Sequence, residues 1–461
     1  MFHTVAAVST PPGKGGVALI RISGEEAAAV ADRMFLPRGG EKLSGMPARR
    51  AVFGSVISPD TGEILDTGIA ILYRAPASYT GEDTAEISCH GGVAVTRAVL
   101  AAAFAAGAEP AGPGDFTRRA FVNGKLTLTE AEAVGLLIDA DTESRRVLAS
   151  GAVRGNLSRA LDPLGDRLSH VLSAIYAAID YPDEDIGDEG EREIAGVIRS
   201  VMADVDRLAS TYKTGSAIAH GIPTAIAGLP NSGKSSLYNA LLGSEAAIVT
   251  DIPGTTRDVL SAQADVGGVT LRLADTAGIR DGADAVEQIG VERARREIAE
   301  AALILLVCDA SVPMSEDFRT LARDVRESAP GAHIIAVLNK SDLPAADGAG
   351  IPDGIADDTV HISAKNGDGL DELRAAVSRA AGTDTLDASS DAVIWDVRQQ
   401  AALSRAYSAL AEAEYALTEG DPLDAVCMLC ETALSEIRGV DGRAVDEEIV
   451  AGIFARFCVG K

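Results

Sequence analysis

The segment Gly228–Ser236 has the residue types and the spacing of a phosphate-binding loop. It follows the apolar run Ile222–Ala227, which predicts a buried strand, and it precedes a segment with the apolar period of a helix. The pattern G-x-x-x-x-G-K-S allows backbone N–H groups to surround a polyphosphate. In such a loop Lys234 reaches the terminal phosphates and the Ser235 hydroxyl ligates Mg²⁺. The sequence therefore predicts a nucleotide site here.

Three later segments indicate which nucleotide binds. Asp275–Gly278 follows an expected strand, where an Asp holds Mg²⁺ through water and a Gly donates to the γ-phosphate. Asn339–Asp342 follows another strand, and Ser363–Lys365 is expected to close over the base. The Asp342 carboxylate can accept both the N1–H and the 2-amino group of guanine, and adenine offers no such donor pair. Because an unpaired buried acceptor is costly, discrimination on the order of 10⁴ is expected, which favours a guanine nucleotide.

The expected hydrolytic residues differ from those of a Ras-type site. Ile279 stands where a water-orienting Gln would be, so other groups must orient the water. Thr250–Asp258 is the expected first switch, with Thr256 as the second Mg²⁺ ligand. Its carbonyls and hydroxyls, together with Asn231, suit a monovalent cation that would neutralise charge between the phosphates. Glu287 is a carboxylate that could orient water, although, taken alone, a solvated helix residue is the favoured interpretation.

Composition limits the class of protein. At 461 residues, two or three domains are expected. The net charge of −27 disfavours broad contact with nucleic acid or anionic membranes, so RNA contacts would need local basic spots or a partner. Arg118 and Arg119 form such a spot, although a solvated helix surface is the simpler interpretation. The low cysteine count of five, with no signal peptide and no membrane-spanning run, leads us to expect a cytoplasmic protein.

Hydrophobic periodicity divides the chain into four parts. Residues 1–118 alternate short strands and helices and predict a small α+β domain. Residues 119–215 and 381–461 are helical, and apolar stripes in both parts could bury each other. Residues 216–380 predict a Ras-like P-loop α/β domain with a mixed sheet, because 259–266 and 269–274 form a hairpin. The expected fold is therefore a nucleotide-binding domain inserted into an α-helical domain that is split in sequence.

The order of motifs resembles the tRNA-modifying GTPase family MnmE (TrmE), over nearly the whole chain. The resemblance rests on Thr10–Gly16, Leu19–Gly24, Tyr79–Asp83, Glu86–Gly92, Gly114–Lys125 and the closing Phe457–Lys461. It implies an N-terminal folate-binding and dimerisation domain, and homodimers that assemble with the FAD-dependent partner MnmG into a heterotetramer or larger complex. It also implies K⁺-stimulated GTP hydrolysis on dimerisation of the GTPase domains. The implied chemistry adds an aminomethyl or carboxymethylaminomethyl group to C5 of the wobble uridine of certain tRNAs, from 5-formyl- or methylene-tetrahydrofolate.

Carried onto matching positions, the resemblance implies the following roles. The folate contacts are Arg21, Glu86, Lys125 and Lys461. The K⁺ ligands are Asn231, Thr250, Ile252 and Thr255; the Mg²⁺ ligands are Ser235 and Thr256; Glu287 orients the water. The GTP-binding residues are Asn231, Ser232, Gly233, Lys234, Ser235, Ser236, Thr250, Asp251, Ile252, Pro253, Gly254, Thr255, Thr256, Asp275, Thr276, Ala277, Gly278, Asn339, Lys340, Asp342, Ser363, Ala364 and Lys365.

Several positions keep a simpler interpretation. Cys458 could take part in the modification or only pack at a helix end, and Lys461 could be a loose terminus. Gly112 and Thr127 depart from the Arg and Asp expected in the family, which bears on folate affinity. Two other functions stay open: a GTP-driven ribosome-assembly or RNA-binding switch, and a folate-dependent one-carbon transferase with a regulatory GTPase. The acidic, helical flanking regions disfavour the first.

Overall fold

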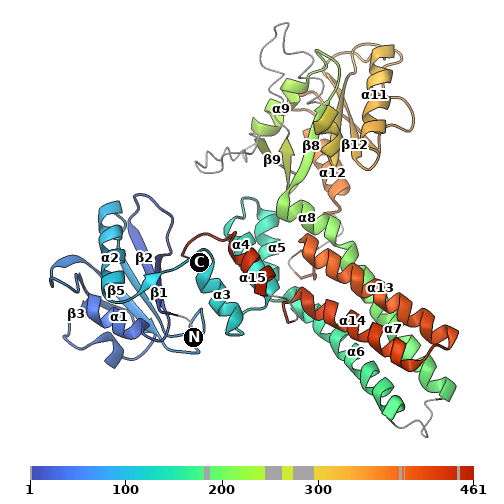
Figure 1. Cartoon of the computed structure of the whole chain (residues 1–461). Coiled ribbons are helices and arrows are strands. Elements are labelled where there is room, and N and C mark those ends of the chain that lie inside the picture. Colours follow the sequence, from blue (N-terminus) through green and yellow to red (C-terminus); the bar gives the residue numbers. More distant parts are fainter. Residues whose placement is uncertain are drawn as a thin grey trace. The chain divides into compact units, whose positions relative to one another are not determined.

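The computed structural model describes residues 3–180, 187–243, 262–273, 295–383, 387–388, 390–443 and 447–460 (Figure 1). The chain separates into two compact units. One contains Met1–Gly135 together with Leu434–Lys461, and the other contains Leu136–Ala433. The fold class expected from the sequence is confirmed: a small α+β part, α-helices and a P-loop domain with a mixed sheet. The four-part domain division stays a prediction.

The first unit contains a seven-stranded sheet in the order β3-β4-β5-β6-β2-β1-β7. All neighbouring strands pair antiparallel except β1 and β7. The strands are β1 (Val5–Val8), β2 (Val17–Ser23), β3 (Phe35–Pro37), β4 (Val52–Ile57), β5 (Ile64–Tyr73), β6 (Thr84–His90) and β7 (Glu109–Pro110). The helices beside it are α1 (Ala27–Met34), η1 (Leu43–Gly45) and α2 (Val93–Ala105).

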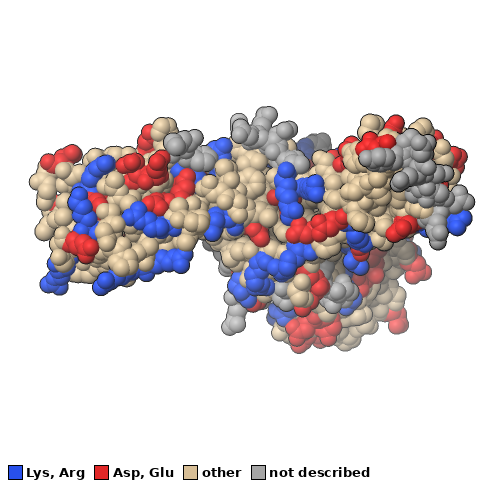
Figure 2. Space-filling model, turned by 90° about the horizontal axis from the view of Figure 1, so that it is seen from below, with Lys and Arg blue, Asp and Glu red and all other residues tan. Residues whose placement is uncertain are grey.

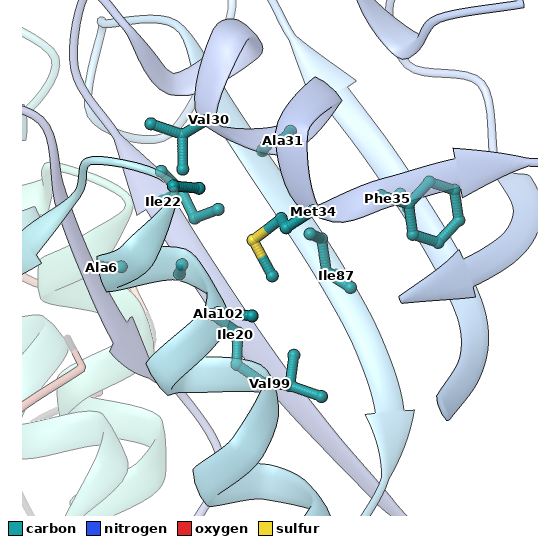
Figure 3. Close-up of a cluster of buried hydrophobic side chains, with 14 of the residues drawn as sticks. Ala6, Ile20, Ile22, Val30, Ala31, Met34, Phe35, Ile87, Val99 and Ala102 are labelled. Carbon is teal, nitrogen blue, oxygen red and sulfur yellow. The ribbon is translucent and has the colours of Figure 1, made fainter. Parts of the chain in front are cut away.

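One face of this sheet is covered by α1 and α2. Along β2, the buried residues Ala18, Ile20 and Ile22 alternate with residues of the other face, as the period of two in a strand requires. Figure 3 shows Ile20 and Ile22 among Val30 and Met34 of α1 and neighbouring apolar side chains of α2. The opposite face carries Arg21 and Glu86, which lie between these buried positions, so their side chains lie away from the helices.

The rest of the first unit is helical and includes the C-terminal segment. It comprises α3 (Asp115–Val122), the first turns of α4 (Leu128–Ile138) and α15 (Glu447–Phe454). Leu128, Val450 and Phe454 are buried together. Beyond α15, Ser9 Oγ donates to the carbonyl of Gly460 over 2.8 Å, and a Cβ on Gly460 would lie 2.0 Å from the Val8 carbonyl. The end of the described chain is therefore packed against β1; Lys461 lies outside the described residues.

The second unit contains the P-loop domain, a six-stranded sheet in the order β13-β12-β11-β8-β10-β9. Only the β9–β10 pair is antiparallel, as the predicted hairpin requires. Leu303 and Leu305 of β11 face a core shared with α12, and Ile304 and Leu306 face one shared with α11. The elements are β8 (Ile222–Ala227), α9 (Lys234–Gly243), β9 (Ala262–Val266), β10 (Val269–Leu273), β11 (Leu303–Asp309), α11 (Glu316–Ser328), β12 (His333–Asn339), β13 (Asp358–His361) and α12 (Leu370–Ala381).

Long helices form the remainder of the second unit: α5 (Glu143–Val153), α6 (Asn156–Asp180), α7 (Gly187–Ser210), α8 (Tyr212–His220), α13 (Val397–Glu419) and α14 (Leu423–Val440). Helix α7, which precedes the P-loop domain in sequence, packs along α13, which follows it (Figure 1). Arg199 and Glu414 form a salt bridge of 2.6 Å between them. Across the described residues, every helix is too short or too polar to span a membrane.

Candidate functional site

The predicted phosphate-binding loop connects β8 to α9, as the sequence indicates. Asn231 has a φ of +63° and Gly233 a φ of +100°, so the chain turns sharply and the backbone can wrap a ligand. The Lys234 ammonium lies back over the loop, where Nζ donates to the carbonyls of Gly228 (2.9 Å) and Leu229 (2.8 Å). Burial lowers the pKa of Lys234. A partly desolvated cation over a glycine-rich loop suits a polyphosphate.

Three segments that are distant in sequence meet at this loop. Asn339, at the end of β12, donates from Nδ2 to the carbonyl of Ser232 over 2.9 Å. Its Oδ1 accepts a hydrogen bond of 3.0 Å from the backbone N–H of Ala364. Ser363 Oγ donates to Asp342 Oδ1 over 2.8 Å. Asn339 therefore ties the phosphate loop to the segment around Ser363, and Ser363 holds the carboxylate of Asp342.

A half-buried ion pair lies at the same corner. Lys340 has a φ of +67°, and its ammonium pairs with Asp309 at the end of β11. Burial alone would raise the pKa of Asp309, but hydrogen bonds from Lys340 and Ser311 outweigh burial and lower it. The pair ties Lys340, which lies between Asn339 and Asp342 in the sequence, to the end of β11.

The residues of the loop fit a bound nucleotide. Ser232 Oγ is buried, and no described residue gives it a hydrogen-bond partner, so a ligand that supplied one would remove the cost of an unpaired polar atom. Ser235 lies in the first turn of α9, as expected of a Mg²⁺ ligand. Four predicted elements lie outside the described residues: the first switch at 250–258, the segment Asp275–Gly278, Ile279 and Glu287. Within the described part of the chain, no cluster of three or more His, Cys, Asp or Glu side chains could hold a metal ion.

The expected folate residues Arg21 and Glu86 are cross-strand partners on β2 and β6. Arg21 Nη2 lies 2.8 Å from Glu86 Oε1, and both side chains are 18% exposed. The Arg21 guanidinium lies over the rings of Tyr79 (5.2 Å to the centroid) and Phe116 (5.5 Å). Tyr73 donates to the second oxygen of Glu86 over 3.3 Å. Carboxylate and guanidinium beside aromatic rings fit a flat heterocycle with hydrogen-bonding edges.

Lys125 reaches the same region through the loop at 76–83. Its Nζ donates to the Pro76 carbonyl over 3.2 Å, and a Cβ on Gly81 would lie 3.2 Å from Lys125 Cγ. Since Tyr79 of this loop contacts Arg21, the structure places Arg21, Glu86 and Lys125 around one loop. The Cys458 thiol is exposed and lies on the wall of a cavity that also borders α2.

Arg119 is the residue that the sequence interpretation misjudged. We expected a solvated helix surface, and that expectation is wrong, because Arg119 is 2% exposed. Its Nη1 lies 2.9 Å from Glu82 Oε2, its Nε lies 3.3 Å from Asp115 Oδ1, and Nη2 donates to the His3 carbonyl over 2.9 Å. The sequence offers no local signal for this pairing, because Glu82 lies 37 residues away from Arg119.

Gly112 and Thr127, the two positions that differ from the family pattern, can each be described from their local contacts. A Cβ on Gly112 would meet nothing within 4 Å, so glycine is not required there by packing. Thr127 precedes α4, where its Oγ1 accepts from the Glu130 N–H (3.3 Å) and its N–H donates to the Glu130 carboxylate (2.8 Å). This reciprocal cap explains how Thr serves where Asp is expected, because both side chains can cap a helix.

The P-loop fold, the phosphate-binding loop between β8 and α9, and the Asn339–Asp342 corner define a guanine-nucleotide-binding protein of the P-loop class. Two family models match: the TrmE N-terminus of GTP-binding proteins over residues 4–125, and the MnmE helical domain over residues 128–458. The chain belongs to the MnmE family of tRNA modification GTPases.

Individual relatives match along the full length. The chain is 40% identical to the tRNA modification GTPase MnmE of Moorella thermoacetica over 99% of both chains, and 41% identical to that of Thermus thermophilus, also over 99% of both. Among solved structures, the G domain of the FeoB iron transporter of T. maritima is 28% identical with a TM-score of 0.25, covering 34% of this chain and 97% of that chain. Aquifex aeolicus Era bound to GDP and AlF4⁻ is 26% identical with a TM-score of 0.26, covering 40% and 65%.

Proposed function

We propose that this protein hydrolyses GTP and, with an FAD-dependent MnmG-type partner, modifies C5 of the wobble uridine at position 34 of certain tRNAs. The added group is aminomethyl or carboxymethylaminomethyl, and a tetrahydrofolate derivative supplies its one-carbon unit. The observation that carries the proposal is the match to named tRNA modification GTPases over the full chain, together with the Asn339 bridge between the phosphate loop and the guanine-reading corner.

In this proposal the chain positions GTP through residues already described. The backbone around Gly233 and the Lys234 ammonium hold the phosphates, and Asp342 accepts from the guanine edge. Mg²⁺, held by Ser235 and Thr256, and K⁺, held by Asn231, Thr250, Ile252 and Thr255, would neutralise phosphate charge. Glu287 would orient the attacking water.

The open face of the N-terminal sheet supports the folate and homodimer parts of the proposal. Arg21 and Glu86 lie on this face, and Lys125 reaches it through the loop at 76–83. The same face carries apolar side chains that α1 and α2 leave uncovered, namely Phe53 at 51% exposed and Ile69 at 43%. Exposed apolar groups on a sheet face favour burial against a second copy of the chain.

The proposal also includes tRNA as a binding partner and the cytoplasm as the location of the protein. The face shown in Figure 2 presents Lys and Arg side chains interspersed with Asp and Glu, so local cations are available to an RNA backbone despite the net charge of −27. All five cysteines are free thiols, in keeping with a reducing compartment.

Mass spectrometry of tRNA nucleosides tests the function directly. A strain that lacks this chain should lose the C5-modified wobble uridines, and the wild-type chain supplied in trans should restore them. The Asp342→Asn variant should restore little, because it no longer reads guanine, whereas Asp353→Asn, an exposed change in the same domain, should restore fully. Unchanged wobble uridines in the deletion strain would refute the proposal.

A further inference from the structure

Asp309 and Asn339 lie side by side at the carboxyl ends of two neighbouring strands. Asp309 ends β11, Asn339 ends β12, and the two residues are register partners in this parallel pair. The Ala310 N–H donates to the Asn339 carbonyl over 2.9 Å, which holds the two strand ends together. Ligands of open α/β sheets bind at the carboxyl ends of the strands. Asp309 therefore lies at the ligand-binding edge of the sheet, although the family resemblance gives it no role.

The Asp309 carboxylate is held through both of its oxygens. Oδ1 accepts hydrogen bonds from the N–H (2.9 Å) and the hydroxyl (2.6 Å) of Ser311. Oδ2 accepts from the Lys340 ammonium over 2.5 Å. The Asp309 side chain is 15% exposed and that of Lys340 is 33% exposed. Ser311 therefore orients the carboxylate, and the carboxylate in turn anchors the end of the lysine side chain.

Lys340 belongs to the turn that reads the base. It follows Asn339, whose amide contacts the phosphate-binding loop, and it precedes Asp342 by two residues. Its φ of +67° is rare for a residue with a side chain, and Asn231 of the phosphate-binding loop shares this conformation. Such strained residues gather at ligand sites. A lysine on this turn would sample many rotamers if its end were free, and the anchor at Asp309 removes that freedom before a nucleotide binds.

The ion pair admits two roles with opposite consequences. Asp309 also borders a cavity of about 120 Å³ beside the phosphate-binding loop, together with Asn231 and Ser232. An unpaired carboxylate there would repel the phosphates of a nucleotide. If Lys340 only neutralises Asp309, then removing the carboxylate charge should leave nucleotide binding intact or improve it. If Asp309 instead positions Lys340, the same change should weaken binding.

We propose that Asp309 is a positioning residue of the guanine nucleotide site, where its carboxylate holds Lys340 against the base and ribose of a nucleotide bound at Asp342. The two donors from Ser311 support this role, because neutralisation alone needs no oriented carboxylate. An anchored side chain loses little further freedom when the nucleotide binds, which favours affinity. The proposal rests on the GTP binding proposed above and is independent of the tRNA chemistry.

Isothermal titration calorimetry of the full-length protein tests the proposal with GDP and the non-hydrolysable analogue GppNHp. Asp309→Asn should bind both nucleotides at least about ten-fold more weakly, and by the same factor, because base and ribose are common to them. Ser311→Ala should lose about two- to three-fold, since one donor to Asp309 remains. Asp371→Asn, which removes a carboxylate from an exposed ion pair with Arg374, should bind as wild type. Wild-type affinity in Asp309→Asn, or a loss confined to GppNHp, would overturn the proposal.

A double variant separates positioning from support of the backbone. Lys340→Gly removes the side chain, and glycine keeps the positive φ without strain. In this background Asp309→Asn should weaken binding no further, and the double variant should stay at least about ten-fold weaker than wild type. Near-wild-type affinity in the double variant would show that the pair only cancels charge or supports the turn, and would overturn the proposal. A wild-type protein that bound no guanine nucleotide would overturn the proposed function together with this inference.

Discussion

The side-chain amide of Asn339 joins the two halves of the nucleotide site: Nδ2 donates to the Ser232 carbonyl over 2.9 Å. The contact is so close that a Cβ on the next residue, Gly233, would lie 2.0 Å from the same nitrogen. The base-reading segment and the phosphate loop are therefore one packed assembly. A change in either should disturb both phosphate binding and guanine selection.

Gly233→Ala tests this packing. The residue has a φ of +100°, and the new methyl group would collide with Asn339, so strain of about 1–3 kcal/mol is expected. We predict a loss of GTP affinity of about 10- to 100-fold, measured with a fluorescent GTP analogue. Gly243→Ala, where a Cβ meets nothing within 4 Å, is the matched control. Equal affinity in the two variants would show that the loop tolerates the clash.

Arg119→Met removes a buried guanidinium and leaves the Glu82 carboxylate without its cation, with the Ser23 hydroxyl still donating to it. Breaking one side of a buried ion pair costs about 3–5 kcal/mol, so we predict a clearly lower midpoint of thermal unfolding for the first unit. The control is Arg50→Met, an exposed arginine with an expected effect within about 0.5 kcal/mol. Similar midpoints in the two variants would mean that the Glu82 network contributes little.

Glu86→Gln keeps the size of the side chain and removes its charge. We predict that 5-formyl-tetrahydrofolate binds at least about ten-fold more weakly, because hydrogen bonds to a charged acceptor contribute about 1.5–3 kcal/mol. Isothermal titration calorimetry measures the affinity, with exposed Glu63→Gln as the control. If Glu86→Gln bound 5-formyl-tetrahydrofolate with wild-type affinity, the Glu86 carboxylate would not contribute to the proposed folate site.

Cys427 and Cys430 form a C-x-x-C pair on α14, and both are buried. Burial raises the pKa of Cys430 to about 12, whereas an unfolded cysteine titrates near about 8.5. Since the folded state resists losing this proton, the stabilisation is complete below about pH 8.5 and declines as pH rises towards 12.

Cys430→Val should therefore lose less stability at high pH than the wild type. Between pH 7.5 and 10, we expect the wild type to fall by about 2 kcal/mol relative to the variant, from 1.36 kcal/mol per pKa unit. Urea unfolding at both pH values measures the difference. Parallel pH dependence in the two proteins would indicate that Cys430 titrates normally.

Much of the P-loop domain could be predicted from sequence, because its signals are local. Apolar runs such as Ile222–Ala227 are strands, and turn residues follow them directly. The long helices also follow from their periodicity: Leu403, Leu410 and Leu417 are buried along α13 as expected.

Contacts between residues that are distant in the sequence could not be predicted in the same way. Nothing in the sequence near Arg119 shows that Glu82, 37 residues away, would bury it. The packing of Gly460 against Val8 joins the two ends of the chain, and periodicity carries no information on such contacts. The end of α1 at Met34 was likewise not readable, because Phe35 begins β3 and is buried in the core.

The central claim is that this chain reads guanine through Asp342, and nucleotide selectivity tests it most directly. Hydrolysis of GTP, ATP and XTP should be measured for the wild type, Asp342→Asn and the control Asp353→Asn. We predict that the wild type and the control prefer GTP strongly. Asp342→Asn should lose that preference and gain activity on XTP, whose 2-oxo group accepts a hydrogen bond from the new amide. A retained preference for GTP in Asp342→Asn, or equal use of GTP and ATP by the wild type, would contradict the account.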